Sequence, residues 1–305
     1  MSQFVLLANS SQKLEQHDEA CCYFEKALSI CRVLNGDFTE TTAYSMIQLA
    51  NAYQLSFRAQ DAINILEHAG MILSKLETQK LTLAGTKIKE EDRKRIALQL
   101  NKLYVQLTNL YMGLDRRAEA DQLISQAEGR LEQCLEDLYT FKLMNELGNC
   151  LRKHDDLPTA VQLYKKSLLS IKIRCKNDYL QMRDTAKILI NIASTEFMQD
   201  ENVESLRYYQ HALNVLKNCP DYPAREIADF RRQGGKSEPE FLLRPEQVTL
   251  AVDLAKVHVS IGHLQKQFGE MGKAHSHFIE AIVSIKPPSF YSNSNIFHTV
   301  SNFAK

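Results

Sequence analysis

Small and large apolar positions recur along this chain at the spacing of one helix face. In each copy a small residue is followed four positions later by a large, mostly apolar residue, and three positions after that by a second small residue. Offsets of four and three place all three residues on one face of an α-helix, where the small ones let a neighbouring helix approach closely. The copies are Ala20-Phe24-Ala27, Ala62-Leu66-Ala69, Ala120-Ile124-Ala127, Ala160-Tyr164-Ser167, Ser205-Tyr209-Ala212 and Ala274-Phe278-Ala281.

A second apolar pattern precedes each copy and contains a small residue of its own. This small residue always lies 12 positions before the residue that opens the following motif: 8 and 20, 50 and 62, 108 and 120, 148 and 160, 193 and 205, 262 and 274. The repeating unit is therefore a helix, a short turn and a second helix in fixed register. We predict an all-α protein, a right-handed α-solenoid of about six helical hairpins over residues 1–286.

These residues resemble the tetratricopeptide repeat, which places a large residue, Leu, Gly or Ala, and Tyr on its first helix and Ala, Phe and Ala on its second. The shortest repeat steps are near 40, longer than the family's usual length of about 34. Repeats of about 42 resemble those of kinesin light chains and of Leu-Gly-Asn-rich cell-polarity adaptors, as do the segments 49–53 and 147–149. The chain departs from the family in having no Trp. The resemblance implies a protein-binding module without catalytic activity.

Two of the intervals between successive copies of the second-helix motif are longer than the others, and they indicate insertions between hairpins. The first insertion, around residues 78–95, is polar and basic; the second, around 219–245, is rich in Pro and Gly. Insertions in a solenoid emerge at the edges of the stack, where they either contact partners or stay passive. Residues 287–305 are expected to form a C-terminal tail or a capping helix, because a solenoid needs its last apolar face covered.

Composition narrows the class of protein. The formal net charge is zero and the sequence pI is about 7.1, so no global field attracts nucleic acid. No apolar run is long enough to span a membrane, and the first residues carry no basic-then-apolar signal. The seven cysteines include no Cys-x-x-Cys pair, which favours reduced thiols. We expect a cytoplasmic protein, with the cytoskeleton or cilium as further locations.

The first-helix face opposite the core is the predicted binding surface. Each hairpin is numbered so that its first-helix core positions are 4, 7, 8 and 11; positions 2 and 9 then point away from the core. An Asn amide both donates and accepts, so a row of them can hold an extended peptide backbone, and the resembling families use Asn at this position for that purpose. The alternative is that these amides bond to an adjacent helix or to water. Position 9 holds Asn9, Asn51, Asn109, Asn149, Ser194 and His263.

Lysine recurs on the same face at position 2. Four consecutive hairpins carry Lys102, Lys142, Lys187 and Lys256 there. Such a stripe attracts carboxylates of a partner, although Lys is also common on any exposed helix face. Asn145 and Asn191 add amides to the predicted peptide-binding residues, while Glu146 interrupts the stripe and could pair with a basic residue of the partner.

Some fragments of the sequence resemble enzyme or metal-binding motifs, but each lacks a part that the motif requires. Gly234-Gly235-Lys236-Ser237 lacks the first Gly of a phosphate-binding loop, and no strand precedes it. The last hairpin is rich in histidine but has no zinc-binding spacing. We therefore expect no catalytic residues, no metal and no cofactor.

The prediction from sequence is a non-enzymatic adaptor that binds an extended or short helical, acidic segment of another protein in its concave groove. Two alternatives stay open. One is a structural subunit of a large cytoskeletal, ciliary or transport complex, packed through the solenoid edges. The other is a peptide-sensing regulator. Neither nucleic acid nor membrane is an expected partner.

Overall fold

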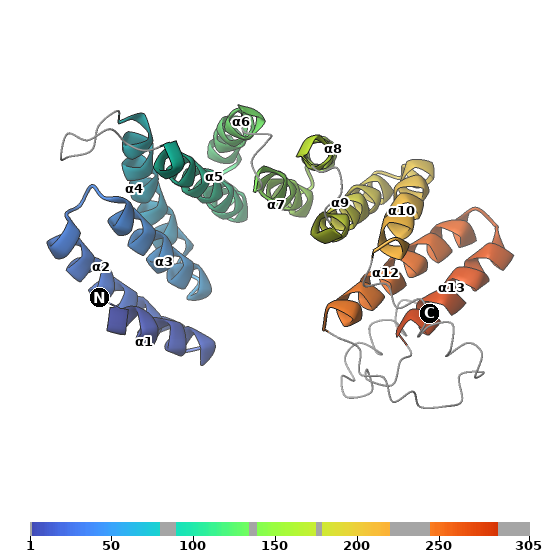
Figure 1. Cartoon of the computed structure of the whole chain (residues 1–305), viewed down its shortest axis with the longest axis horizontal. Coiled ribbons are helices and arrows are strands. Elements are labelled where there is room, and N and C mark those ends of the chain that lie inside the picture. The colour runs from blue at the N-terminus through green and yellow to red at the C-terminus, as the bar shows by residue number, and fades with distance from the viewer. Residues whose placement is uncertain (1, 80–89, 134–138, 175–178, 220–244, 286–305) are drawn as a thin grey trace. The chain divides into compact units, whose positions relative to one another are not determined.

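The computed structural model describes residues 2–79, 90–133, 139–174, 179–219 and 245–285, and these segments are almost wholly α-helical (Figure 1). The helices are α1 (Ser2–Lys13), α2 (His17–Asn35), α3 (Glu40–Leu55), α4 (Ala59–Thr78), α5 (Glu90–Gly113), α6 (Arg117–Gln133), α7 (Thr140–Lys153), α8 (Leu157–Arg174), α9 (Tyr179–Met198), α10 (Asn202–Lys217), α12 (Pro245–Gln267) and α13 (Met271–Ile285). They form six sequential hairpins, which confirms the predicted all-α repeat architecture.

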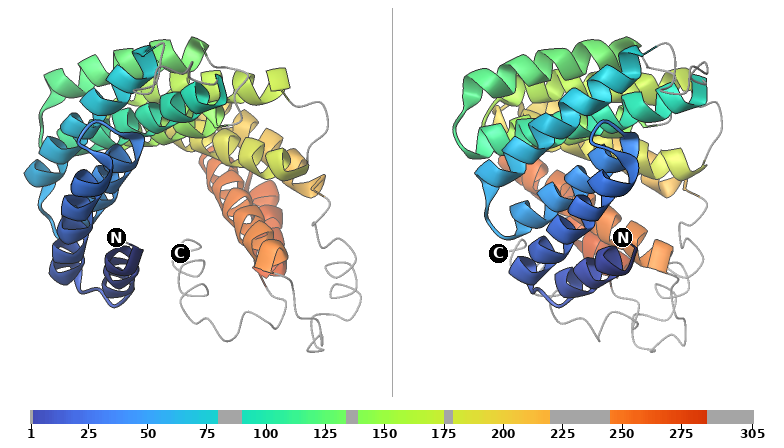
Figure 2. Two further views of the ribbon diagram at one scale, coloured as in Figure 1. Left: turned by 60° about the vertical axis from the view of Figure 1, so that its left-hand side comes forward. Right: turned by 90° about the vertical axis from the view of Figure 1, so that its left-hand side faces the viewer.

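Contacts between residues divide the chain into two compact units, Met1–Cys150 and Leu151–Lys305. In the first unit α1 to α6 pack in sequence, each helix against the next. In the second unit α8 packs on α9, α9 on α10, α10 on α12 and α12 on α13. Each hairpin is therefore stabilised mainly by its sequence neighbours, as in other repeat proteins. Figure 2 shows this order in two further views.

The same turn joins the two helices of all six hairpins. The residue at position 15 has a left-handed backbone, with φ between 58° and 77°. The next residue donates its backbone N–H to the carbonyl of position 11 at 2.8–3.0 Å, which is the bond of a Schellman helix end. This turn explains the constant 12-residue interval between the two motifs. Position 15 is Glu15, Phe57, Asp115, Asp155, Asp200 and Gly269.

Small residues at positions 8 and 20 lie where the two helices of a hairpin cross. In the fifth hairpin Ser205 Oγ donates to the carbonyl of Ala193 at 2.7 Å, so positions 20 and 8 are in contact. In the sixth hairpin a Cβ added to Gly262 would lie 2.7 Å from Phe278 Cε1. The buried small residues at position 20 confirm the predicted core pattern, and they are Ala20, Ala62, Ala120, Ala160, Ser205 and Ala274.

Polar contacts tie one hairpin to the next. Tyr53 Oη donates to Glu25 Oε1 at 2.7 Å, and Tyr111 Oη donates to Glu67 Oε1 in the same way. Each pair joins position 11 of a first helix to position 25 of the preceding second helix. The guanidinium of Arg58 also stacks on the Tyr53 ring at 4.3 Å. These pairs set the register between neighbouring hairpins.

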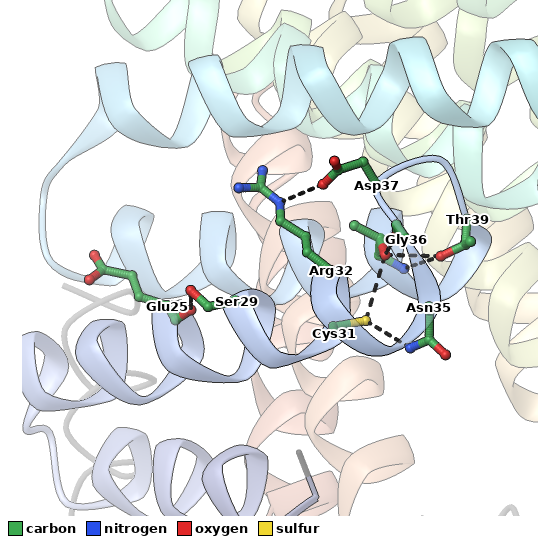
Figure 3. A network of polar contacts seen from close by, with 9 residues as sticks. Glu25, Ser29, Cys31, Arg32, Asn35, Gly36, Asp37 and Thr39 are labelled. Atoms are coloured by element: carbon green, nitrogen blue, oxygen red, sulfur yellow. Dashed lines mark hydrogen bonds and ion pairs between the residues drawn. The ribbon is translucent and has the colours of Figure 1, made fainter.

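The link between α2 and α3 is a compact polar network (Figure 3). Thr39 caps α3 by accepting the backbone N–H of Thr42 at 3.2 Å, and Thr42 Oγ1 donates to the carbonyl of Gly36 at 2.7 Å. Asn35 Nδ2 donates to the buried Cys31 Sγ at 3.4 Å, a contact visible in Figure 3. Burial opposes ionisation of this thiol, but hydrogen bonds from neighbouring hydroxyl and amide groups outweigh it and lower the pKa of Cys31. Arg32 Nε lies 3.5 Å from Asp37 on the surface of the same link.

Several predictions concern residues outside the described segments. In the first insertion α4 ends at Thr78 and α5 already begins at Glu90, so 90–95 is helical, while 80–89 is not described. Residues 220–244, with the Gly-Gly-Lys-Ser fragment, and the tail 287–305 also lie outside the described residues. The cysteines that the structure describes are reduced thiols, and they are Cys21, Cys22, Cys31, Cys150 and Cys219. Among the described helices none is long and apolar enough to cross a membrane.

Candidate functional site

A pocket of about 670 Å³ opens on the first unit. Its walls come mainly from the first helices α1, α3 and α5, and its floor comes from the second helices α2 and α4. A volume of this size lies within the range of about 300–1,000 Å³ that is usual for ligand sites. The lining residues are Val5, Leu6, Phe24, Ala27, Glu40, Thr41, Tyr44, Ser45, Ile47, Gln48, Leu73, Arg95 and Gln99.

The pocket has a buried apolar floor and exposed apolar walls. Phe24 and Leu73 are buried, whereas Leu6 and Tyr44 keep 66% and 54% of their surface accessible. Large apolar side chains exposed beside a hollow lose water contact when a partner covers them, so such a place favours binding. The geometry suits apolar side chains of a partner.

An ion pair forms one rim of the pocket. Arg95 Nε and Nη2 donate to the two carboxylate oxygens of Glu40, both at 2.7 Å, and Arg95 also lies 3.0 Å from Asp92. The hydrogen bond with Glu40 and its negative charge raise the pKa of Arg95. Because this pair is bidentate, its charges are largely satisfied within the protein. The rim therefore fixes the start of α3 against α5.

This pocket was not predicted from the sequence. The prediction used positions 2 and 9 together with Asn145 and Asn191, whereas the pocket is lined by other residues, among them Val5, Leu6, Ile47 and Gln48 at positions 5 and 6. Tyr44, at position 2, belongs both to the predicted binding face and to the pocket lining. The available signal was the run of Val and Ile at position 5, where Ile47 is buried in the structure.

The predicted Asn row is not uniform. Asn9 is exposed, while Asn51 accepts a hydrogen bond from Gln106 of the next first helix at 3.3 Å. Asn109 is exposed and donates to the carbonyl of Val105 in its own helix at 3.2 Å. Asn145 and Asn149 are half-buried. The bond of Asn51 to a neighbouring helix is of the kind expected if these amides serve the fold and not a peptide. An amide with one partner still keeps further donor and acceptor capacity, however.

In the first unit Lys102 and Lys142 are exposed, and the charges of both act on Glu146. Desolvation raises the pKa of Glu146, and the charges of Lys102 and Lys142 oppose this shift, so the three groups lie within electrostatic reach. The Lys102 ammonium also lies 5.4 Å from the centre of the Tyr139 ring. Glu146 thus takes up part of the positive charge that the sequence predicted for this face.

The second unit shows the same arrangement with different residues. Lys187 and Lys256 are exposed, and burial raises the pKa of Asp253 while Lys256, Lys187 and Arg183 oppose the shift. Asn191 is half-buried, and its backbone carbonyl accepts the hydroxyl of Thr195 at 2.7 Å. These residues form a separate group from those of the first unit.

The histidines of the last hairpin make a pair. His258 Nδ1 and His277 Nδ1 lie 2.8 Å apart between α12 and α13. Burial lowers the pKa of His277, as does the nearby charge of Lys217. Within the described segments no group of three or more His, Cys, Asp or Glu side chains is placed to hold a metal ion.

Comparisons with known proteins agree with this architecture. The tetratricopeptide-repeat family model matches residues 4–69, which span the first hairpin and part of the second. No curated protein matches the chain in sequence. Among solved structures, BtubC (BKLC) from P. vanneervenii matches 88% of this chain and 90% of its own, with a TM-score of 0.58 at 13% identity.

Two further structures cover nearly the whole chain. The apo form of RapI matches 93% of this chain and 96% of its own, with a TM-score of 0.52 at 11% identity. A putative kinesin light chain from Podospora anserina, with nearly identical TPR-like repeats, matches 96% and 97% with a TM-score of 0.37 at 12% identity. The BtubC and RapI structures, with TM-scores above 0.5 but low identity, show similarity of fold alone.

Proposed function

We propose that this chain is a tetratricopeptide-repeat protein and acts as a non-enzymatic adaptor, because the family model matches residues 4–69 and repeat proteins of this fold generally bind other proteins. It holds a segment of a partner protein on the first helices of its first unit. The segment is extended or forms a short helix, places apolar side chains in the pocket and carries acidic residues beside them.

The apolar pocket is the observation that carries this proposal. It combines a volume of about 670 Å³ with exposed Leu6 and Tyr44 above a floor that includes Phe24. Covering exposed apolar surface contributes about 25 cal/mol for each Å² removed from water, so the pocket supplies most of the affinity. Ordering of the segment opposes binding.

The acidic preference rests on the lysines beside the pocket. Gln99 lines the pocket, and Lys102 lies three residues later on α5, so their side chains share one helix face. Lys142 lies near Lys102, because both charges act on Glu146. Around Lys102 two ammonium groups and one carboxylate leave a local excess of positive charge, while Arg95, Glu40 and Asp92 at the rim carry one net negative charge. An acidic residue of the partner, next to its apolar anchors, would meet that excess.

Selection from a peptide library tests the proposal directly. Random 16-residue peptides displayed on phage would be selected against the full chain, and the enriched peptides measured by fluorescence anisotropy. Leu6→Glu changes an exposed pocket residue, so we expect Kd to rise at least tenfold while the fold is retained. Leu169→Glu, on an exposed leucine of α8, is the matched control and should leave Kd unchanged. Lys102→Glu should shift enrichment away from acidic peptides.

The possible results separate the two parts of the proposal. If no peptide is enriched, or if Leu6→Glu and Leu169→Glu behave alike, the pocket is not the binding site. If Leu6→Glu alone weakens binding but Lys102→Glu leaves the selected sequences unchanged, the pocket is retained and the acidic preference is rejected.

One observation favours the alternative of a complex subunit packed through its edges. Phe57 lies at the α3–α4 turn and is 95% exposed in a left-handed conformation, which is unfavourable for an aromatic residue on both counts. Leu14 and Leu114 are exposed at the equivalent turns of the neighbouring hairpins. Phe57→Ser should therefore reduce co-purification of a complex without affecting peptide binding if the edge is the contact.

A further inference from the structure

A guanidinium without an ion pair lies on the first helices of the second unit. Arg152, near the end of α7, is half-buried, and its Nη1 donates to Ser194 Oγ of α9 at 3.1 Å. Its Nε is enclosed and donates to no acceptor among the residues that the structure describes. Other arginines pair with carboxylates, as Arg95 does with Glu40, but none of the described carboxylates forms an ion pair with Arg152. A half-buried charge without a counter-charge is unfavourable, so binding of an anion here would relieve that cost.

Hydroxyl groups surround this guanidinium. Burial raises the pKa of Tyr164, while the charge of Arg152 and a hydrogen bond from it oppose the shift. Burial likewise raises the pKa of Tyr209, and a hydrogen bond with Ser260 and the charge of Arg152 oppose that shift. Hydroxyls satisfy hydrogen bonds but supply no negative charge, so they position Arg152 without neutralising it.

Further cationic and amide groups lie along one face of α9. Four of its side chains follow one another at offsets of four, four and three, which places them on the same helix face, and they are Arg183, Lys187, Asn191 and Ser194. Lys256 of α12 lies close to this row, because its charge and that of Lys187 both act on Asp253. From Ser194 to Lys187 is about 10 Å along the helix axis, a distance that the long lysine side chain can reduce. The row therefore leads from Arg152 into a cluster of positive charge.

The cations around this row outnumber the carboxylates by two among the described residues. The carboxylates are Asp253 and Asp184, of which Asp184 lies beside Lys187 on α9 and has an interaction of its own. A phosphate monoester carries a charge of about −1.5 to −2 at pH 7, whereas a carboxylate carries a single charge. Arginine also donates two parallel N–H groups to phosphate oxygens. Charge and donors therefore suit a phosphate better than a carboxylate. The cations are Arg152, Arg183, Lys187 and Lys256.

We propose that Arg152, Ser194 and Asn191 bind the phosphate of a phosphorylated side chain in a partner protein. Arg152 and the Asn191 amide donate to phosphate oxygens, and the Ser194 hydroxyl turns toward the phosphate from the Asn191 carbonyl, to which it donates at 3.0 Å. The exposed Lys187 and Lys256 neutralise the remaining charge. The ligand is a protein segment because repeat proteins of this fold generally bind other proteins. The inference does not rest on the pocket, which lies in the other unit.

Selection with phosphopeptides tests the class of ligand. Three pools of peptides with random flanks, which carry phosphoserine, serine or glutamate at the central position, would be passed over the immobilised full chain. The phosphoserine pool should be retained about tenfold more than the serine pool, and clearly more than the glutamate pool. Equal retention of the phosphoserine and glutamate pools would reject a phosphate site. Binding only to vesicles that carry a phosphoinositide would reject a protein ligand.

Substitution of Arg152 tests the location. For the most enriched phosphopeptide, Arg152→Gln should raise Kd about tenfold or more, because it removes the charge and the paired donors. The matched control is Arg207→Gln, on an arginine of α10 whose side chain is 78% exposed, and it should leave Kd unchanged. Arg152→Lys keeps the charge but not the paired donors and should give an intermediate Kd. An unchanged Kd in Arg152→Gln, or equal changes in Arg152→Gln and Arg207→Gln, would overturn the proposal.

A second substitution keeps the test decisive if Arg152→Gln unfolds, which circular dichroism would reveal. Lys187 is exposed, so Lys187→Gln should retain the fold, raise Kd about threefold and reduce the dependence of Kd on salt. Lys273→Gln, on an exposed lysine of α13, is its control and should change neither quantity. If Lys187→Gln and Lys273→Gln behave alike, the phosphate does not bind on this face. The pocket of the first unit is tested separately by Leu6→Glu, which should leave phosphopeptide binding unchanged.

Discussion

Lys165 and Glu196 form an ion pair at 3.3 Å that takes the place of a tyrosine–carboxylate hydrogen bond. The two residues hold positions 25 and 11 of successive hairpins, the positions at which Glu25 accepts the hydroxyl of Tyr53. The carboxylate has moved from the second helix to the first, and the link between hairpins is preserved. Different residue types thus maintain the same contact in each unit.

Removal of the Tyr53 hydroxyl should weaken the link between the first two hairpins. Tyr53→Phe keeps the ring and its stacking with Arg58 but leaves Glu25 without this donor. We expect a loss of about 1 kcal/mol in the free energy of unfolding, measured by urea denaturation. Tyr44→Phe removes an exposed hydroxyl and serves as the control. An equal effect of both substitutions would show that the hydrogen bond contributes nothing.

Three tyrosines should titrate late in alkaline solution. Burial is the main cause that raises the pKa of Tyr53, Tyr111 and Tyr164 to about 12, and for the first two the hydrogen bond to Glu25 or Glu67 adds to it. A pKa raised in the folded state stabilises the fold fully below the unfolded value of about 10, and this contribution is lost as the pH rises through about 12. Tyrosinate absorbance should therefore show a transition near pH 12, and the amplitude of this transition should be smaller in the double variant Tyr53→Phe/Tyr111→Phe. A single transition near pH 10 in the folded protein would contradict this.

The turn at Phe57 should become more stable when its side chain is removed entirely. Phe57 has φ of 58° and is almost fully exposed, so it contributes backbone strain and little packing. Phe57→Gly relieves the strain, and we expect a gain of about 0.5–1 kcal/mol after the added freedom of the unfolded chain is counted. Phe57→Ala retains a Cβ and should gain much less. A loss of stability in the glycine variant would show that Phe57 packs on the protein.

Two glycines of the last hairpin should respond oppositely to the same substitution. Gly262→Ala places a methyl group 2.7 Å from Phe278 Cε1, and the forced shift should destabilise the protein by about 1–3 kcal/mol. Gly272 lies in α13 with nothing within 4 Å of an added Cβ. Gly272→Ala should therefore stabilise by up to about 1 kcal/mol, because alanine favours the helix. Thermal denaturation monitored by circular dichroism measures both, and shifts of the same sign would contradict this.

The fold could be predicted from sequence because the register of the hairpins depends on local residues. Small residues at positions 8 and 20 are required where the helices cross, as the contact of Ser205 with Ala193 shows, so their 12-residue interval is visible without a structure. The pocket could not be predicted, because it depends on how side chains of five helices leave a space. Gln106, the partner of Asn51, and Lys102, one of the charges that act on Glu146, come from neighbouring hairpins, and spacing within one hairpin does not reveal them.

The turn at position 15 also bears on how the protein forms. The bond that closes each hairpin joins residues only five positions apart, and the helices that it joins are consecutive. Contacts between residues close in sequence form fast, since little loop entropy is lost. Each hairpin can therefore close as soon as its second helix has left the ribosome, and it then offers a folded surface to the next hairpin during synthesis.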